Sequence, residues 1–324
     1  MVRGGFDPAL EWKRATTTVP TFEAAARRYH DNVKAGWKNG KHGAQWLTTL
    51  EAHAFPEIGK LPVSEIDAAA IQRVLLPIWL KVPETARRVR QRVGAVLDYA
   101  HGQGWRPTEA PMRAVGKGLP KQTAKRGHFA AMPYADLPSF MSRLRESEAS
   151  VGRLALQFAI LTAARSGEVR GATWEEIDLD VATWTIPAGR MKAGEAHVVP
   201  LSQPALHLLQ QVQNFGTGRY GAPIFPGLKG QPLSDMTLAK ALRLAGGDGA
   251  TVHGMRSSFR DWVAEKMPTV PGDVAEAALA HAISNKTEAA YRRAKYLDQR
   301  RDLMVAWGNY LEVRSNVVAL VAKR

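Results

Sequence analysis

Six side chains that could act together on a charged substrate occur in short motifs in the second half of the chain. The motifs are AARSGEVRGATW (163–174), RMKAGEAHVVPLS (190–202), HGMRSSFRDW (253–262) and LAHAISNKTEAAY (279–291). A phenol has a pKa near 10 and is a poor nucleophile at neutral pH, so a reactive tyrosine needs help from its surroundings. The motifs supply that help as positive charge; the six residues in chain order are Arg165, Lys192, His253, Arg256, His281 and Tyr291.

The chemistry that suits such a set is metal-free cleavage of a phosphodiester. Breaking this bond requires cations that meet the negative charge developing on the nonbridging oxygens. Arginine does so with two parallel hydrogen bonds from its planar guanidinium group. His253 precedes Arg256 by three residues, so the two share a face if that segment is helical. Nearby cations also favour the ionised phenol of a tyrosine.

Other catalytic patterns are missing from the sequence. The chain has no cysteine, which excludes disulfides, thiolate nucleophiles and cysteine-based zinc sites. HExxH does not occur, and GWKNGKHG (36–43) lacks the spacing of a phosphate-binding loop. Asp and Glu show no spacing that demands paired metal ions, although a spatial group of carboxylates stays open as an alternative. We therefore expect neither a metal nor a cofactor.

The composition points to a polyanionic partner. The chain of 324 residues is 45% hydrophobic, so it can bury real cores. Its formal charge is +14 and its pI about 10.1, which favours nucleic acid first and an anionic membrane surface second. No apolar run approaches the roughly 20 residues needed to span a bilayer, and the N-terminus lacks the apolar core of a signal peptide. We expect a cytoplasmic protein that binds nucleic acid and no membrane.

The first half of the chain predicts a small all-helical domain at residues 19–115, after a tail at 1–18. A helix is indicated at 83–105, where an apolar stripe recurs with helical spacing on Val89, Val93, Val96, Leu97 and Ala100. Arg87 and Arg88 fall away from this stripe, while Arg90 and Arg92 flank it. Given the net charge, we predict that these four arginines contact DNA; a merely solvated face is the alternative. Further helices are predicted at 21–37, 42–55 and 64–80.

A basic linker is predicted at residues 116–130, followed by a mixed domain at 131–324. Lys121, Lys125 and Arg126 of the linker would follow the phosphates of a duplex. In the second domain, residues 174–202 alternate like strands and are broken by Pro187, Gly189 and Gly194, which predicts a small antiparallel sheet with Lys192 near a turn. The remaining segments are helical. The predicted fold class is therefore mainly α with a small antiparallel β-sheet.

The motifs, in this order, resemble the tyrosine recombinases of the phage-lambda-integrase family. AMPYADLPSF (131–140) and AAYRRAKYLDQRRDLM (289–304) resemble integrases of satellite phages and genomic islands. The resemblance covers the chain from about residue 6. It implies a helical core-binding domain, a catalytic domain and a site-specific recombinase that integrates or excises a mobile element through a 3′-phosphotyrosine.

The resemblance also implies roles for the six residues. Arg165 and Arg256 match the two arginines of the family, and His253 and His281 match its two histidine positions. Tyr291 matches the nucleophile, and Lys192 matches the lysine that protonates the leaving 5′ oxygen. Each role has a structural alternative: an ion pair for Arg165, a solvated turn for Lys192, a helix cap for His253 and a packing role for His281. Glu168, Trp262 and Trp307 are expected to be structural.

One spacing departs from the pattern of many family members. Tyr291 follows His281 by ten residues instead of nine, which we interpret as a one-residue loop insertion. Tyr296 is the competing nucleophile. Five residues on a helix turn by about 500°, so the two tyrosines would point about 140° apart and could not share one role.

The resemblance implies double-stranded attachment core sites as partner, a monomer in free solution and four protomers on paired sites. Accessory DNA-bending proteins are further candidates. The segment after Tyr291 is expected to dock on a neighbouring protomer through Leu303, Met304, Trp307 and Leu311, with packing on its own domain as the alternative. The opening MVRGGFDPAL (1–10) resembles the end of an arm-binding domain, so we expect that domain to be missing.

Two other functions stay open at this point. A type IB topoisomerase uses nearly the same residues, and relaxation of supercoiled DNA by a monomer would favour it. A non-catalytic architectural DNA-binding protein would explain the charge but not the tyrosine motif. A covalent protein–DNA adduct would distinguish an enzyme from such a protein.

Overall fold

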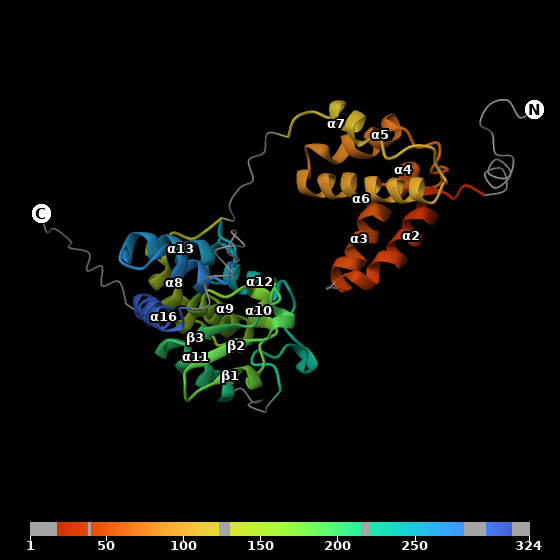
Figure 1. Cartoon of the computed structure of the whole chain (residues 1–324). Helices are drawn as coiled ribbons and strands as arrows, with labels where there is room; N and C mark the ends of the chain where they lie inside the picture. The colour runs from red at the N-terminus through yellow and green to blue at the C-terminus, as the bar shows by residue number, and fades with distance from the viewer. Residues whose placement is uncertain (1–17, 38–39, 123–129, 215–220, 282–295, 313–324) are drawn as a thin grey trace, which may run out of the picture. The chain divides into compact units, whose positions relative to one another are not determined.

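The computed structural model describes residues 18–37, 40–122, 130–214, 221–281 and 296–312. The chain divides into two compact units, unit 1 at residues 1–126 and unit 2 at 127–324 (Figure 1). Each unit has its own buried apolar cluster. No helix within the described ranges is long and apolar enough to cross a membrane.

Unit 1 is helical, and its helices start where the sequence provides caps. The Thr21 hydroxyl accepts a hydrogen bond from the Ala24 amide at 3.3 Å, and the Asp67 carboxylate accepts one from the Ala70 amide at 2.8 Å. The helices are α2 (Phe22–Val33), α3 (Gly40–His53), α4 (Phe55–Ile58), α5 (Ala68–Trp79), α6 (Pro83–Gly102) and α7 (Met112–Lys117).

The core of unit 1 is built on α6, which contacts α2, α3 and α5 (Figure 1). All five residues of its predicted apolar stripe are fully buried, which confirms the predicted face. The short helix α7 was not predicted, because six residues are too few to show helical periodicity. The chain beyond it still packs on unit 1, since the Trp79 indole donates to the Pro120 carbonyl at 2.7 Å.

The arginines of α6 divide into exposed and internal ones. Arg87 and Arg88 are exposed and pair with Glu84 at 3.3 Å each. Arg90 is half-buried and donates to the Met112 carbonyl at 3.0 Å. Arg92 is only 7% exposed and donates to the carbonyls of Gln45 and Trp46 at 3.0 and 3.3 Å. The predicted DNA contact is therefore wrong for Arg92.

Arg92 is buried because α6 is packed against other helices on several sides. Arg92 flanks the apolar stripe where α3 covers α6, so its guanidinium group ties the two helices together. Burial lowers the pKa of Arg92, followed in size by the positive charge of Arg88. Sequence periodicity shows which face is apolar but not how far the neighbouring helices wrap around it.

Unit 2 is built around α9 (Val151–Thr162), which is buried along most of its length. Its other helices are α8 (Leu137–Glu146), α10 (Ser166–Arg170), α11 (Gln203–Asn214), α12 (Thr237–Leu244), α13 (Gly254–Lys266), α14 (Gly272–Ala278) and α16 (Leu297–Glu312). A three-stranded antiparallel sheet of order β1-β2-β3 completes it, from β1 (Ile177–Asp178), β2 (Thr183–Ile186) and β3 (His197–Pro200). The predicted fold class, mainly α with a small antiparallel sheet, is confirmed.

The helix α16 packs on its own unit. Leu303, Met304, Trp307 and Leu311 are at most 2% exposed, and the Trp307 indole donates to the Ile160 carbonyl of α9 at 2.9 Å. Trp262 packs against Trp307 at 4.9 Å between ring centroids, which confirms the predicted packing role of both tryptophans. The predicted docking of these four apolar side chains on a neighbouring protomer is wrong, since the core of unit 2 already covers them.

Removing the Trp307 ring is expected to destabilise unit 2. Trp307→Ala should lower the free energy of unfolding by about 3–5 kcal/mol, because it leaves a cavity and an unpaired Ile160 carbonyl. Val305→Ala, on the same helix at 42% exposure, is the matched control and should stay within about 0.5 kcal/mol of the parent. Chemical denaturation measures both; equal stability of the two variants would contradict the packing of α16.

Arg92 and Arg88 are expected to differ in what they stabilise. Arg92→Gln should leave the Gln45 and Trp46 carbonyls without their donor, at a cost of about 1–3 kcal/mol. Faster amide hydrogen exchange in α3 and α6 would report this loss. Arg88→Gln, at an exposed position on the same helix, should leave exchange unchanged; faster exchange in that variant alone would reverse the assignment.

Candidate active site

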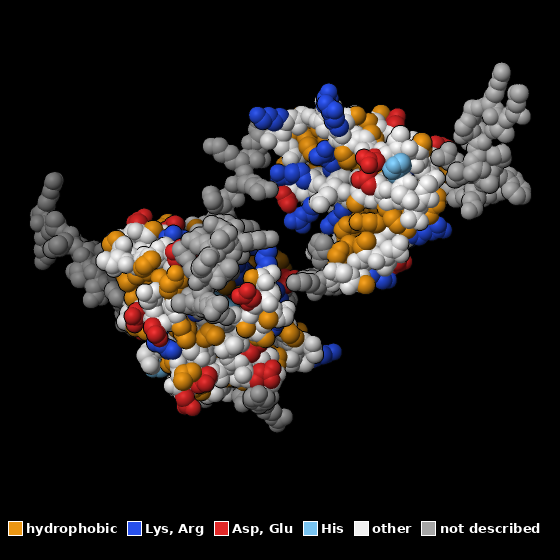
Figure 2. Space-filling model, viewed as in Figure 1, with side chains coloured by type: hydrophobic (Ala, Val, Ile, Leu, Met, Phe, Trp, Pro, Cys, Tyr) orange, Lys and Arg blue, Asp and Glu red, His pale blue; other side chains and the backbone are white. Residues whose placement is uncertain are grey.

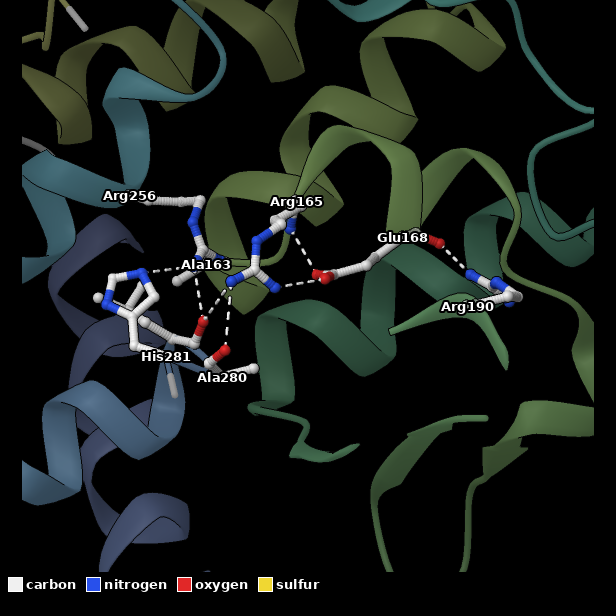
Figure 3. A network of polar contacts seen from close by, with 8 residues as sticks. Ala163, Arg165, Glu168, Arg190, Arg256, Ala280 and His281 are labelled. Carbon is white, nitrogen blue, oxygen red and sulfur yellow. Dashed lines mark hydrogen bonds and ion pairs between the residues drawn. The ribbon is translucent and has the colours of Figure 1, made fainter. Parts of the chain in front are cut away.

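The structure gathers four of the six predicted residues at one place in unit 2, and Figure 3 labels three of them, Arg165, Arg256 and His281. Arg165 precedes α10, and Arg256 lies in the first turn of α13. His253 is the N-cap residue just before α13, and His281 follows the end of α14. Lys192 lies exposed in the β2–β3 connection, in a turn closed by the Gly194 amide on the Met191 carbonyl at 3.1 Å. Tyr291 lies outside the described residues.

Arg256 is the most buried member of the group, at 4% exposure. Its Nη1 donates to the Ala163 carbonyl at the end of α9, and its Nη2 donates to the Leu279 carbonyl at 2.6 Å. Its Nε is buried and has no hydrogen-bond partner among the residues that the structure describes. Burial, followed by the positive charge of Arg165, lowers the pKa of Arg256 to about 10, so the side chain remains charged at neutral pH.

Arg165 is held by Glu168, which is buried to 6% exposure. The Arg165 amide donates to Glu168 Oε2 at 2.8 Å, and Nη1 donates to Oε1 at 2.7 Å. Nη2 donates to the Ala280 carbonyl at 3.2 Å and lies 3.5 Å from the Leu279 carbonyl that Arg256 also uses. The expected structural role of Glu168 is thus confirmed. Arg190 in turn donates to the backbone carbonyl of Glu168 (Figure 3).

Two alanines with left-handed backbones shape this arrangement. Ala163 has φ of 49° and ends α9, and Ala280 has φ of 49° just after α14. At the second position the Ala280 amide donates to the Ala277 carbonyl at 3.1 Å and the His281 amide to the Glu276 carbonyl at 3.0 Å. These bonds form a Schellman motif, which usually has glycine at the left-handed position. The first turn directs the Ala163 carbonyl at Arg256, and the second directs the Ala280 carbonyl at Arg165.

The two histidines have different surroundings. His281 Nδ1 lies 2.6 Å from Glu276 Oε2, and its Nε2 lies 3.2 Å from Nη2 of Arg256. Since arginine can only donate, Nε2 accepts and Nδ1 donates to the carboxylate. Partial burial, followed by the charges of Arg256 and Arg165, lowers the pKa of His253, which favours its neutral form.

Sequence reasoning missed several residues that support this site. Glu276 and Arg260 flank His281 and are joined by an ion pair of 2.7 Å. A five-residue spacing across a helix end has no helical periodicity, so only the Schellman geometry reveals the pair Glu276–His281. His197 of β3 was also missed; burial, followed by the charge of Arg300, lowers its pKa to about 4, so it is neutral at pH 7.

The remaining predicted residues lie in or near unit 1. Figure 2 shows Lys and Arg side chains gathered on the face of this unit that is in view. Lys121 is exposed, whereas Lys125 and Arg126 lie outside the described residues. Within the described ranges, no group of three or more His, Asp or Glu side chains could hold a metal ion.

The geometry of the cluster supports binding of an anion. Two guanidinium groups share the Leu279 carbonyl, and His281 contacts one of them. Within the described part of the chain, the hydrogen-bond partners of Arg256 are two carbonyls and His281, with no carboxylate among them. A phosphate oxygen that reached this cluster would meet the buried guanidinium group of Arg256, and burial strengthens such electrostatic interactions.

Family models and known proteins match nearly all of the described chain. A model described as phage integrase central domain matches residues 22–117, and one described as phage integrase family matches residues 131–297. The chain is 34% identical over 297 residues to prophage integrase IntA of Escherichia coli K12, covering 90% of this chain and 70% of the relative. It is 33% identical over 339 residues to the integrase of Enterobacteria phage P4, covering 96% and 74%.

Solved structures share the fold. A lambda integrase tetramer bound to a Holliday junction has a TM-score of 0.66 at 18% identity, covering 88% of this chain and 84% of the other. A lambda integrase (75–356) dimer bound to a COC′ core site has a TM-score of 0.63 at 18% identity, covering 82% and 96%. With the two family matches and the relatives above 30% identity, the chain belongs to the phage integrase family and is a site-specific DNA recombinase of the tyrosine type.

Proposed function

We propose that Tyr291 cuts DNA while Arg165, Arg256, His253 and His281 bind the scissile phosphate, in the course of integrating or excising a mobile element. The observation that carries this assignment is the contact network in which the two arginines share the Leu279 carbonyl and His281 contacts Arg256. The two arginines and the two histidines come from three separate segments of unit 2, before α10, at the start of α13 and after α14, so their convergence is specific.

In the proposed step Tyr291 releases its phenolic proton to solvent, and the phenolate oxygen attacks phosphorus and forms a 3′-phosphotyrosine. The bond from phosphorus to the 5′ oxygen breaks, and Lys192 donates a proton to that oxygen. The guanidinium groups meet the charge on the nonbridging oxygens in the transition state. The covalent link preserves the bond energy, so the 5′ hydroxyl of another strand can reverse the step without ATP.

The proposed partner is a double-stranded attachment core site, occupied by two protomers and paired with a second site in a tetramer. Structures of lambda integrase as a dimer on a core site and as a tetramer on a Holliday junction support this reading. We assign phosphate contacts to the exposed Arg87, Arg88 and Lys121, and to Lys125 and Arg126. Arg90 is a weaker candidate, because its guanidinium group already serves the Met112 carbonyl.

Tyr291→Phe is expected to abolish covalent attachment to a nicked suicide substrate while leaving core-site binding nearly unchanged. The phenylalanine lacks the attacking oxygen but keeps the ring. Tyr296→Phe is the matched control: Tyr296 is described, has φ of 48° and packs against the core of unit 2. A denaturing gel detects the adduct; an adduct that survives Tyr291→Phe and disappears in Tyr296→Phe would transfer the role to Tyr296.

Strand exchange between two labelled core sites separates recombination from relaxation. A protein that forms the adduct and relaxes supercoiled DNA, yet never joins strands from different sites, would contradict the proposed integration and excision.

Lys192→Ala is expected to slow cleavage of ordinary DNA by about 10²-fold or more, because a general acid contributes on the order of 10²–10⁴. A substrate with a 5′-phosphorothiolate leaving group needs no proton and should restore the rate. Lys229→Ala, an exposed lysine in another loop, should match the parent on both substrates. Equal impairment of Lys192→Ala on both substrates would remove Lys192 from the acid role.

A further inference from the structure

Glu276 contacts Arg260 of α13 directly and is linked to Arg256 of the same helix through His281. Its Oε1 accepts from Arg260 Nε at 2.7 Å, and its Oε2 accepts from His281 Nδ1 at 2.6 Å. His281 Nε2 then lies 3.2 Å from Arg256 Nη2. Arg256 and Arg260 are four residues apart and share one face of α13. The four side chains therefore form a chain of contacts from Arg256 to Arg260 that links α13 to the end of α14.

The backbone conformation at the end of α14 brings Glu276 and His281 into contact. In the Schellman motif at the end of α14, the His281 amide donates to the Glu276 carbonyl at 3.0 Å. These two positions of the motif commonly carry apolar side chains in contact with each other. Here they carry a carboxylate and an imidazole, so the pair is joined by both main chain and side chain.

Charge agrees with this geometry. Burial raises the pKa of Glu276, but hydrogen bonds from Arg260 and His281 outweigh it and hold the pKa below its usual range. Glu276 is therefore ionised at neutral pH and accepts from His281 with one oxygen while the other is occupied by Arg260. A carboxylate restrained in this way fixes both the tilt and the tautomer of an imidazole.

We propose that Glu276 is a positioning residue that keeps a proton on Nδ1 of His281 and aims Nε2 at Arg256 and the phosphate beside it, with Arg260 as its anchor. The inference rests on the proposed role of His281 at the phosphate. Two forms of the His281 imidazole are compatible with this positioning role. In the neutral form Nε2 accepts from Arg256, and in the charged form Nε2 donates to a phosphate oxygen. Both keep the Nδ1 proton on Glu276.

The test is Glu276→Gln in the full chain, read by two independent measurements. Nitrogen-15 NMR of the imidazole rings, with His281→Gln to assign the signal, reports which ring nitrogen of His281 carries the proton. In the parent, Nδ1 should be protonated; in Glu276→Gln that signature should weaken and the Nε2–H tautomer should appear. Cleavage of the suicide substrate should slow on the order of 10-fold through loss of one charge-assisted hydrogen bond, with core-site affinity unchanged.

Two further variants sharpen the result. Asp273→Asn removes a carboxylate from the same helix and should leave the imidazole signal and the rate as in the parent. Arg260→Gln keeps Glu276 but removes its anchor, so it should shift the signal and the rate in the same direction by less. A merely structural Glu276 would change the melting temperature without changing the tautomer.

The outcomes separate this inference from the proposed function. If the parent forms no adduct, the proposed function fails, while the imidazole signal still tests the contact between Glu276 and His281. If Glu276→Gln keeps the Nδ1–H signature, or changes it while cleaving at the parent rate, the positioning role is overturned.

Discussion

The rest of the candidate active site depends on how the buried guanidinium group of Arg256 is held. Removing a charge from water is costly unless hydrogen bonds compensate for the lost solvation. Here the compensation comes from the backbone carbonyls of Ala163 and Leu279, at the ends of α9 and α14. Their dipoles accept from Nη1 and Nη2 without cancelling the charge. Three helices are thereby joined around a cation that still attracts an anion.

The carboxylates near Arg256 contact its neighbours and not Arg256 itself. Glu168 pairs with Arg165, and Glu276 pairs with His281 and Arg260. Each carboxylate orients a side chain that contacts the neighbourhood of Arg256, while Arg256 itself bonds to carbonyls and to His281. The two arginines share the Leu279 carbonyl at the centre of the network, and the carboxylates hold its edges in place.

Sequence reasoning predicted the features that periodicity and motif order encode. The apolar stripe of α6, the small antiparallel sheet and the mainly helical class are confirmed, as is the structural role of Glu168. Two predictions failed because burial depends on neighbours that a single helix does not reveal: Arg92 is covered by α3, and the apolar face of α16 is covered by its own unit. Glu276 escaped notice because a Schellman turn, and not a helical repeat, brings it to His281.

Ala163 and Ala280 bind the two arginines through their carbonyls, so these contacts depend on backbone conformation and not on the identity of the side chain. Any residue carries a carbonyl, so the partners of the two arginines would survive many substitutions at Ala163 and Ala280 as long as φ stays near 49°. A β-branched residue resists that conformation, whereas glycine adopts it freely. Mutational tolerance at these two positions should therefore follow conformational preference, with glycine accepted and valine or isoleucine rejected.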